Sequence, residues 1–127
     1  MASHHPKPSV YVVDDDDAVR DSLALYLTLK GMNVTIFGSA QELLDHDDGA
    51  PQILVLDVNM PGMDGIMLLE ILRKRGHAEP AVFITGLGDS DIKARAARTG
   101  AAAFYDKPLD PAVLFSVLTR LLSEAHV

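Results

Sequence analysis

Short apolar runs alternate along this chain with longer segments in which apolar residues recur three or four positions apart. Short runs rich in β-branched or aromatic residues favour buried strands, and the chain has five of them, at 10–13, 34–37, 53–56, 81–84 and 102–105. Each run is followed by a segment with the apolar spacing of a helix, around 22–30, 39–44, 64–72, 89–99 and 110–121. The pattern therefore predicts five successive β-α units.

The expected strands are apolar on both faces, which is typical of a parallel sheet covered by helices on both sides. Right-handed crossovers between the strands then give an α/β fold in three layers, with a doubly wound five-stranded parallel sheet in the middle. In such sheets ligands bind beyond the carboxyl ends of the strands. The residues that follow each strand are therefore the first place to look for chemistry.

Residues that can cap a helix precede the expected helices. We expect N-caps at Asp17, Ser39, Asp64, Asp89 or Ser90, and Asp110. The last helix has a clear inner apolar stripe, formed by Leu114, Val117, Leu118 and Leu121. The fourth helix has fewer inward candidates, namely Ile92, Ala96 and Ala97. We therefore expect the fourth helix to be packed more lightly than the last.

The composition is that of a single globular domain, with 127 residues, of which 48% are hydrophobic and 23% charged. No apolar run approaches the roughly 18 residues of a membrane span. The first residues are polar and lack the apolar stretch of a signal peptide, so we expect a cytoplasmic protein with no membrane contact. We divide the chain into a tail at 1–8 and one domain at 9–125.

Acidic residues dominate the charge of the chain, whose formal net charge is −7. This balance disfavours direct binding of nucleic acid by the domain. Four of the eighteen acidic residues are consecutive, at 14–17, and like charges in a row repel one another. The cluster is either a solvated loop with a helix cap or part of a cation site.

Polar side chains follow four of the five expected strands. Asp14 and Asp15 follow the first strand, Asp57 the third, Thr85 the fourth, and Lys107 comes shortly after the fifth. Adjacent strands lie about 4.8 Å apart, so these side chains can converge. Carboxylates suit Mg²⁺ and can attack phosphorus, while a lysine and a hydroxyl can hold phosphoryl oxygens. This set of groups is suited to phosphoryl transfer onto an aspartate.

Four motifs at these strand ends resemble, in order and spacing, those of the receiver domains of bacterial two-component response regulators. They read VVDD at 12–15, LDVNMPGMDG at 56–65, ITG at 84–86 and DKPL at 106–109. The similarity spans nearly the whole chain and is strongest to receivers of the NarL/FixJ type. It implies the flavodoxin-like fold of CheY.

The resemblance implies that Asp57 accepts a phosphoryl group from the phosphohistidine of a sensor histidine kinase. It also implies that Asp14, Asp15 and Asp57, with the backbone carbonyl of Asn59, bind Mg²⁺, for which Mn²⁺ or Ca²⁺ can substitute. The domain would then be a regulatory phosphoacceptor that catalyses only its own phosphorylation and dephosphorylation, and not an enzyme acting on other substrates.

The remaining roles also come from the resemblance. Lys107 would pair with Asp57 at rest and with the phosphoryl group after transfer, and its peptide bond to Pro108 is expected to be cis. Thr85 would move inward to a phosphoryl oxygen, and Phe104 would be the aromatic switch residue that enters the space Thr85 leaves. Leu87 departs from the pattern, because that position near the path of the hydrolytic water is usually polar.

Four other aspartates have ordinary structural interpretations. Asp16 and Asp17 favour the positive end of the first helix, Asp64 caps the third helix, and Asp106 is expected to face solvent. We do not expect any of them to bind the metal.

We expect the domain to control an effector, most simply in transcription, through a surface formed by the fourth helix, fifth strand and fifth helix. A stand-alone receiver that acts by protein contacts or as a phosphorelay intermediate is the alternative. By resemblance, the kinase docks near the first helix, and phosphorylation can promote a homodimer.

Three rival functions fit the sequence less well. A calcium loop is disfavoured because Pro61 and Leu68 stand where oxygen ligands are needed. A flavin-binding protein would need a phosphate loop after the first strand, where this chain has four aspartates. A phosphatase with an aspartate nucleophile would usually carry an acid two residues later, where Asn59 stands.

Overall fold

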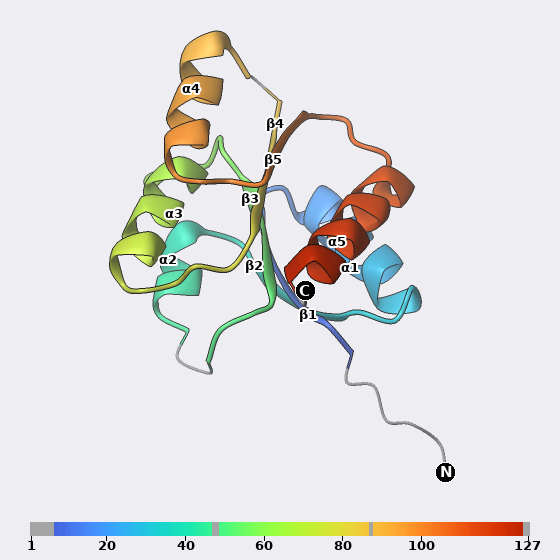
Figure 1. Cartoon of the computed structure of the whole chain (residues 1–127). Helices are drawn as coiled ribbons and strands as arrows, with labels where there is room; N and C mark the ends of the chain where they lie inside the picture. The colour runs from blue at the N-terminus through green and yellow to red at the C-terminus, as the bar shows by residue number, and fades with distance from the viewer. Residues whose placement is uncertain (1–6, 47–48, 87, 126–127) are drawn as a thin grey trace.

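The computed structural model describes residues 7–46, 49–86 and 88–125. Strands and helices alternate throughout this part of the chain (Figure 1). The strands are β1 (Ser9–Val13), β2 (Asn33–Phe37), β3 (Ile53–Asp57), β4 (Ala81–Thr85) and β5 (Ala103–Asp106). The helices are α1 (Asp17–Leu29), α2 (Ala40–Leu44), α3 (Gly65–Lys74), α4 (Ser90–Arg98) and α5 (Pro111–Ala125). The predicted order of five β-α units is confirmed.

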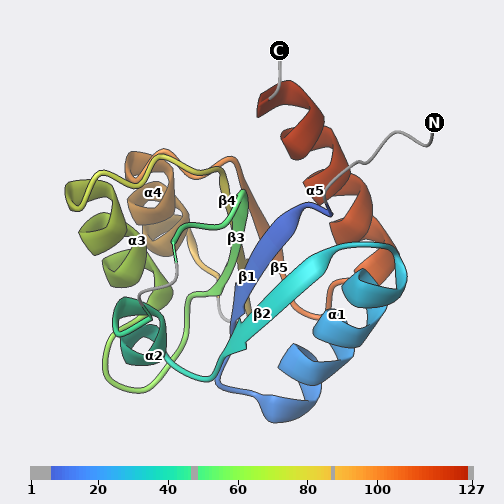
Figure 2. The ribbon, with the colours of Figure 1, turned by 90° about the horizontal axis from the view of Figure 1, so that it is seen from below.

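The strands form one parallel sheet in the order β2-β1-β3-β4-β5. Helices α1 and α5 cover one face of the sheet, and α2, α3 and α4 cover the other (Figure 2). Every residue of β3 and β4 is buried, which explains why these strands read as continuous apolar runs. The doubly wound three-layer fold predicted from the sequence is therefore correct.

Polar side chains begin the helices as predicted, with one exception. Ser39, Asp64 and Asp89 cap α2, α3 and α4 by accepting hydrogen bonds from backbone N–H groups, and Asp110 does the same at the start of α5. The prediction of Asp17 as the cap of α1 is wrong. Asp16 has the extended backbone that a cap requires and accepts from the backbone N of Val19 at 3.1 Å. Asp17 is the first helical residue.

The two helices that flank β5 differ in how deeply they are buried, as predicted. The expected inner stripe of α5 is buried, and Leu122 joins it. On α4 only Ala96 is buried, Ile92 is partly buried, and Ala97 is exposed. The prediction that Ala97 faces inward is wrong, because one residue further along a helix turns the side chain by about 100°. Among the residues described, no helix is both long and apolar enough to cross a membrane.

Strand β5 begins and ends one residue later than predicted, so that it includes Asp106. Most of the expected tail, like Leu87, lies outside the described residues.

Candidate functional site

Two buried carboxylates lie at the carboxyl edge of the sheet. Asp57 is the last residue of β3, and Asp14 directly follows β1, which is paired with β3. Each of these residues is only 3% exposed. Burying a carboxylate is costly unless a partner compensates its charge. The sequence therefore places two acidic groups where they need a cation.

Lys107 supplies that cation in this structure. Its Nζ lies 3.0 Å from Oδ2 of Asp14 and 3.2 Å from Oδ2 of Asp57. The lysine is held at the start of the β5–α5 connection because its backbone N donates to the carbonyl of Thr85 at 2.8 Å. The expected cis peptide bond between Lys107 and Pro108 is present. One ammonium group is thus shared between two carboxylates.

The charges at this edge do not balance, and the titration of Asp57 reflects this. Burial, and then the negative charge of Asp14, raise the pKa of Asp57 to about 7, although Lys107 and the backbone N–H of Asn59 oppose the shift. Burial alone would lower the pKa of Lys107, but its hydrogen bonds and charge interactions with Asp14 and Asp57 outweigh burial and raise it. Lys107 therefore stays charged while Asp57 is held partly protonated near neutral pH. A second cation at this site would favour the ionised form of Asp57.

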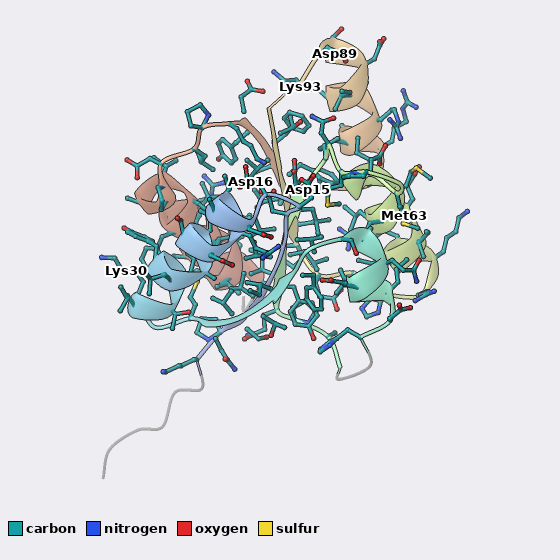
Figure 3. The ribbon with its side chains drawn as sticks, turned by 180° about the vertical axis from the view of Figure 1, so that it is seen from behind. Asp15, Asp16, Lys30, Met63, Asp89 and Lys93 are labelled. Carbon is teal, nitrogen blue, oxygen red and sulfur yellow. The ribbon has the colours of Figure 1, made fainter. Side chains whose placement is uncertain are left out.

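A third carboxylate makes the site suitable for a divalent cation. Asp14, Asp15 and Asp57 each offer a carboxylate oxygen, and these oxygens lie within 4.8 Å of one another. Asp15 is exposed and stands with Asp16 just before α1 (Figure 3). Oxygen donors of this kind fit Mg²⁺, and also Mn²⁺ or Ca²⁺. Asp16 points one carboxylate oxygen at the start of α1 instead, as its cap.

Asn59 connects the aspartate to Thr85. Its backbone N donates to Oδ1 of Asp57 at 3.3 Å, and its side-chain Nδ2 donates to Oγ1 of Thr85 at 2.6 Å. Thr85 is fully buried. By resemblance, Asn59 was expected to bind the metal through its carbonyl and to flank the path of the hydrolytic water with its side chain, but the contact of that side chain with Thr85 was not predicted. It joins the loop after β3 to the end of β4.

Phe104 lies on β5, two strands along the sheet from β3, which ends in Asp57. It is partly buried, its ring centroid is 6.4 Å from that of Phe83, and Nζ of Lys93 lies 5.8 Å above the ring. Phe104 thus connects the sheet to α4, on which Lys93 and the cap Asp89 stand (Figure 3). Asp106, two residues further along β5, is exposed.

Two residues near the site were not singled out from the sequence. Gly65 begins α3 against the end of β3, and a Cβ at this position would overlap the backbone carbonyl of Asp57. Its place in the motif LDVNMPGMDG was the available signal. Arg20 donates to the backbone carbonyl of Asp14 at 3.3 Å and pairs with Asp17 at 2.9 Å. Arg20 reaches Asp14 because the first turns of α1 lie beside the end of β1.

The fold and the strand-end cluster agree with comparisons against known proteins. The chain belongs to the response regulator receiver domain family, whose profile matches residues 10–119. It is 40% identical over 119 residues to the transcriptional regulatory protein FixJ of Azorhizobium caulinodans, which covers 91% of this chain and 56% of that protein. It is 34% identical over 117 residues to the response regulator protein TodT of Pseudomonas putida, covering 91% of this chain and 52% of that protein.

A solved structure shows the same architecture. The crystal structure of a CheY-like response regulator receiver domain protein from Methanospirillum hungatei superposes with a TM-score of 0.88 at 28% identity, covering 93% of this chain and 95% of that one. The chain spans about half the length of the curated relatives it matches. It is therefore a receiver domain of a two-component response regulator, similar to the receiver part of transcriptional regulators.

Proposed function

We propose that Asp57 accepts a phosphoryl group from the phosphohistidine of a sensor histidine kinase and that this event switches an effector. One observation carries the proposal: the buried carboxylate of Asp57 shares the ammonium group of Lys107 with Asp14, at 3.2 and 3.0 Å. The three groups gather at the carboxyl end of a parallel sheet, where such folds bind ligands. Family membership supports the same function.

In the proposed reaction, a carboxylate oxygen of Asp57 attacks phosphorus while the phosphorus–nitrogen bond to the histidine breaks, and that bond's electrons remain on the imidazole. Asp14, Asp15 and Asp57 would hold Mg²⁺, which supplies charge neutralisation for the phosphoryl oxygens. Lys107 exchanges its contact with the Asp57 carboxylate for one with a phosphoryl oxygen. The Thr85 hydroxyl leaves Asn59 and donates to another phosphoryl oxygen.

A hollow beside the site supports docking of the kinase near α1. It has a volume of about 350 Å³ and lies between the beginning of α1 and the β5–α5 connection. Its lining includes Val19 and Leu23 from α1, together with Lys107, Pro108 and Leu109. An apolar hollow next to Lys107 fits a protein surface that delivers a phosphoryl group to the neighbouring Asp57.

We place the output on α4, β5 and α5. Phe104 lies on β5, its ring contacts Lys93 of α4, and α4 buries a single residue, so that this helix can shift at low cost. One of the two named relatives, FixJ, is a transcriptional regulatory protein, which favours an effector that acts in transcription in the cytoplasm. A receiver that acts alone, by protein contacts or phosphorelay, is the second candidate, and a homodimer formed on phosphorylation is compatible with either.

Incubation with a small phosphodonor tests the reaction. With acetyl phosphate and Mg²⁺, we expect the intact mass to rise by one phosphoryl group, and we expect no gain for Asp57→Ala or when Mg²⁺ is removed by a chelator. Equal gain by the wild type and Asp57→Ala would show that another residue is the acceptor. Failure of the wild type to gain mass, both with the donor and with a phosphorylated histidine kinase, would contradict the proposed reaction.

A further inference from the structure

Gly88, in the connection between β4 and α4, sits in a crowded place. A Cβ at this position would lie 2.9 Å from Oδ1 of Asp106, 3.0 Å from Cε1 of Phe104 and 3.1 Å from Cγ2 of Thr85. These neighbours share one face of the sheet, because Thr85 is paired with Asp106 and Phe104 precedes Asp106 by two residues. Gly88 therefore covers the two residues expected to move on phosphorylation.

The backbone does not explain this glycine. Five other glycines, Gly31, Gly49, Gly62, Gly76 and Gly100, have a positive φ, which side chains rarely adopt, but Gly88 is not among them. Neighbouring atoms, and not the backbone angles, crowd a side chain here: the exposed Asp106 can turn aside, whereas Thr85 and Phe104 would each have to give way by a few tenths of an ångström. Gly86, two residues earlier in the same connection, offers a direct contrast, because a Cβ there would meet nothing within 4 Å.

The geometry of Thr85 suggests why position 88 has no side chain. The hydroxyl and the methyl group are attached to the same carbon, so one cannot turn about the Cα–Cβ bond without the other. The hydroxyl accepts from Asn59 at 2.6 Å, whereas the methyl group is directed at Gly88. When the hydroxyl leaves Asn59 for a phosphoryl oxygen, the methyl group has to move in the space beside Gly88.

We propose that Gly88 is a positioning residue whose missing side chain leaves room for the Thr85 methyl group to turn and for the Phe104 ring to follow. The inference rests on the proposed phosphorylation of Asp57. It adds that the step from Thr85 to Phe104 requires glycine at position 88, while phosphoryl transfer does not. The ring of Phe104 carries the change to α4 through its contact with Lys93.

The test separates phosphorylation from switching. Gly88→Ala, Gly86→Ala and the wild type are treated with acetyl phosphate and Mg²⁺, their mass gain is measured, and backbone amide resonances are followed at 90–98 and 103–106. All three proteins are expected to gain one phosphoryl group. The amide shifts that phosphorylation causes in these segments are expected to be kept in Gly86→Ala and largely lost in Gly88→Ala. A thermal melt establishes that each variant is folded.

A double variant identifies the contact responsible. Thr85→Ser removes the methyl group that the new side chain would meet but keeps a hydroxyl, so adding it to Gly88→Ala is expected to restore much of the lost shift, measured against Thr85→Ser alone. Gly88→Ala switching like the wild type, or a double variant as impaired as Gly88→Ala, would overturn the role of Gly88 and leave phosphorylation standing. If the wild type gains no phosphoryl group, the proposed function fails, and the role of Gly88 fails with it.

Discussion

Polar groups have different surroundings at the two edges of the sheet, the amino edge where the strands begin and the carboxyl edge where they end. At the amino edge, Arg73 donates to the backbone carbonyls of His77, Glu79 and Thr99 at 3.2, 2.8 and 3.2 Å, and Ser9 and Gln52 exchange hydrogen bonds of 3.0 Å. These contacts give backbone groups beside β1, β3, β4 and β5 a partner. At the carboxyl edge, by contrast, buried Asp14 and Asp57 share one lysine.

The difference shows where the fold gives up stability for function. Hydrogen bonds at the amino edge give partners to part-buried and exposed backbone groups. The raised pKa of Asp57 shows that the folded protein disfavours the charge that its proposed reaction requires. A protein selected only for stability would not keep two buried acids on one lysine. Changes at the two edges should therefore have opposite effects on stability.

The largest effect is expected for Asp57→Asn, at the carboxyl edge. The pKa of Asp57 is raised to about 7 in the folded protein, so between roughly pH 4 and pH 7 the folded state binds a proton that the unfolded state releases. Wild-type stability should fall as the pH rises through this window. Asp57→Asn lacks this titration and should be more stable above pH 8, by up to about 4 kcal/mol, with the difference shrinking towards pH 4.

Urea unfolding in the presence of a chelator, repeated from pH 4 to pH 8, measures this difference. Asp106→Asn is the matched control, because Asp106 ends the strand two positions along the sheet from β3 but is exposed. It should follow the wild-type pH dependence. If the stability of Asp57→Asn and of the wild type depended on pH in the same way, the fold would not disfavour the ionised form of Asp57.

The next effect is expected at the amino edge, for Arg73→Met. The variant keeps the apolar part of the side chain but leaves three carbonyl groups without their charged donor, which should destabilise the fold by about 2 to 3 kcal/mol. Uptake of the phosphoryl group from acetyl phosphate should be unchanged. Lys74→Met alters an exposed neighbour and should change stability by less than about 0.5 kcal/mol. A loss of phosphorylation in folded Arg73→Met would contradict the separation of the two edges.

The smallest effect is expected for Gln52→Ala, also at the amino edge. It removes the side-chain acceptor for the backbone N of Ser9, a bond that is exposed to solvent. The loss should be about 0.5 to 1 kcal/mol, readable as a shift of the urea midpoint with an unchanged slope. A gain in stability would show that this pairing is not part of what holds the amino edge together.

Much of this contrast could be predicted from the sequence at one edge and little at the other. Strand periodicity and the rule that parallel strands bring their carboxyl ends together were enough to place Asp14, Asp57 and Lys107 near one another. The contacts of Arg73 could not be predicted, because they depend on where α3 ends relative to two later connections. A charged residue on the flank of a helix looks the same in the sequence whether it faces solvent or backbone carbonyls.

The wrong predictions for Asp17 and Ala97 have a similar origin. To decide whether Asp16 or Asp17 caps α1, or whether Ala97 faces inward, the phase of the helix must be known to within one residue. Adjacent aspartates or alanines do not carry that information. Gly88 and Gly65 raise a different difficulty, because each glycine is crowded by atoms of another structural element. Pattern and spacing predict which elements form, whereas close contacts between elements decide which small residue is essential.

The rigidity of the support beneath Asp57 has a mechanical consequence. Asp57 ends a strand that is buried along its whole length, and α3 begins so close to its carbonyl that only glycine fits at position 65. Neither element can yield when a bulky phosphoryl group is added, because both are close-packed. We therefore expect the proposed phosphorylation to displace the connections that follow β3 and β4, and not β3 or α3. In the proposed function, this rigid support beneath Asp57 would direct the movement that follows phosphorylation towards α4.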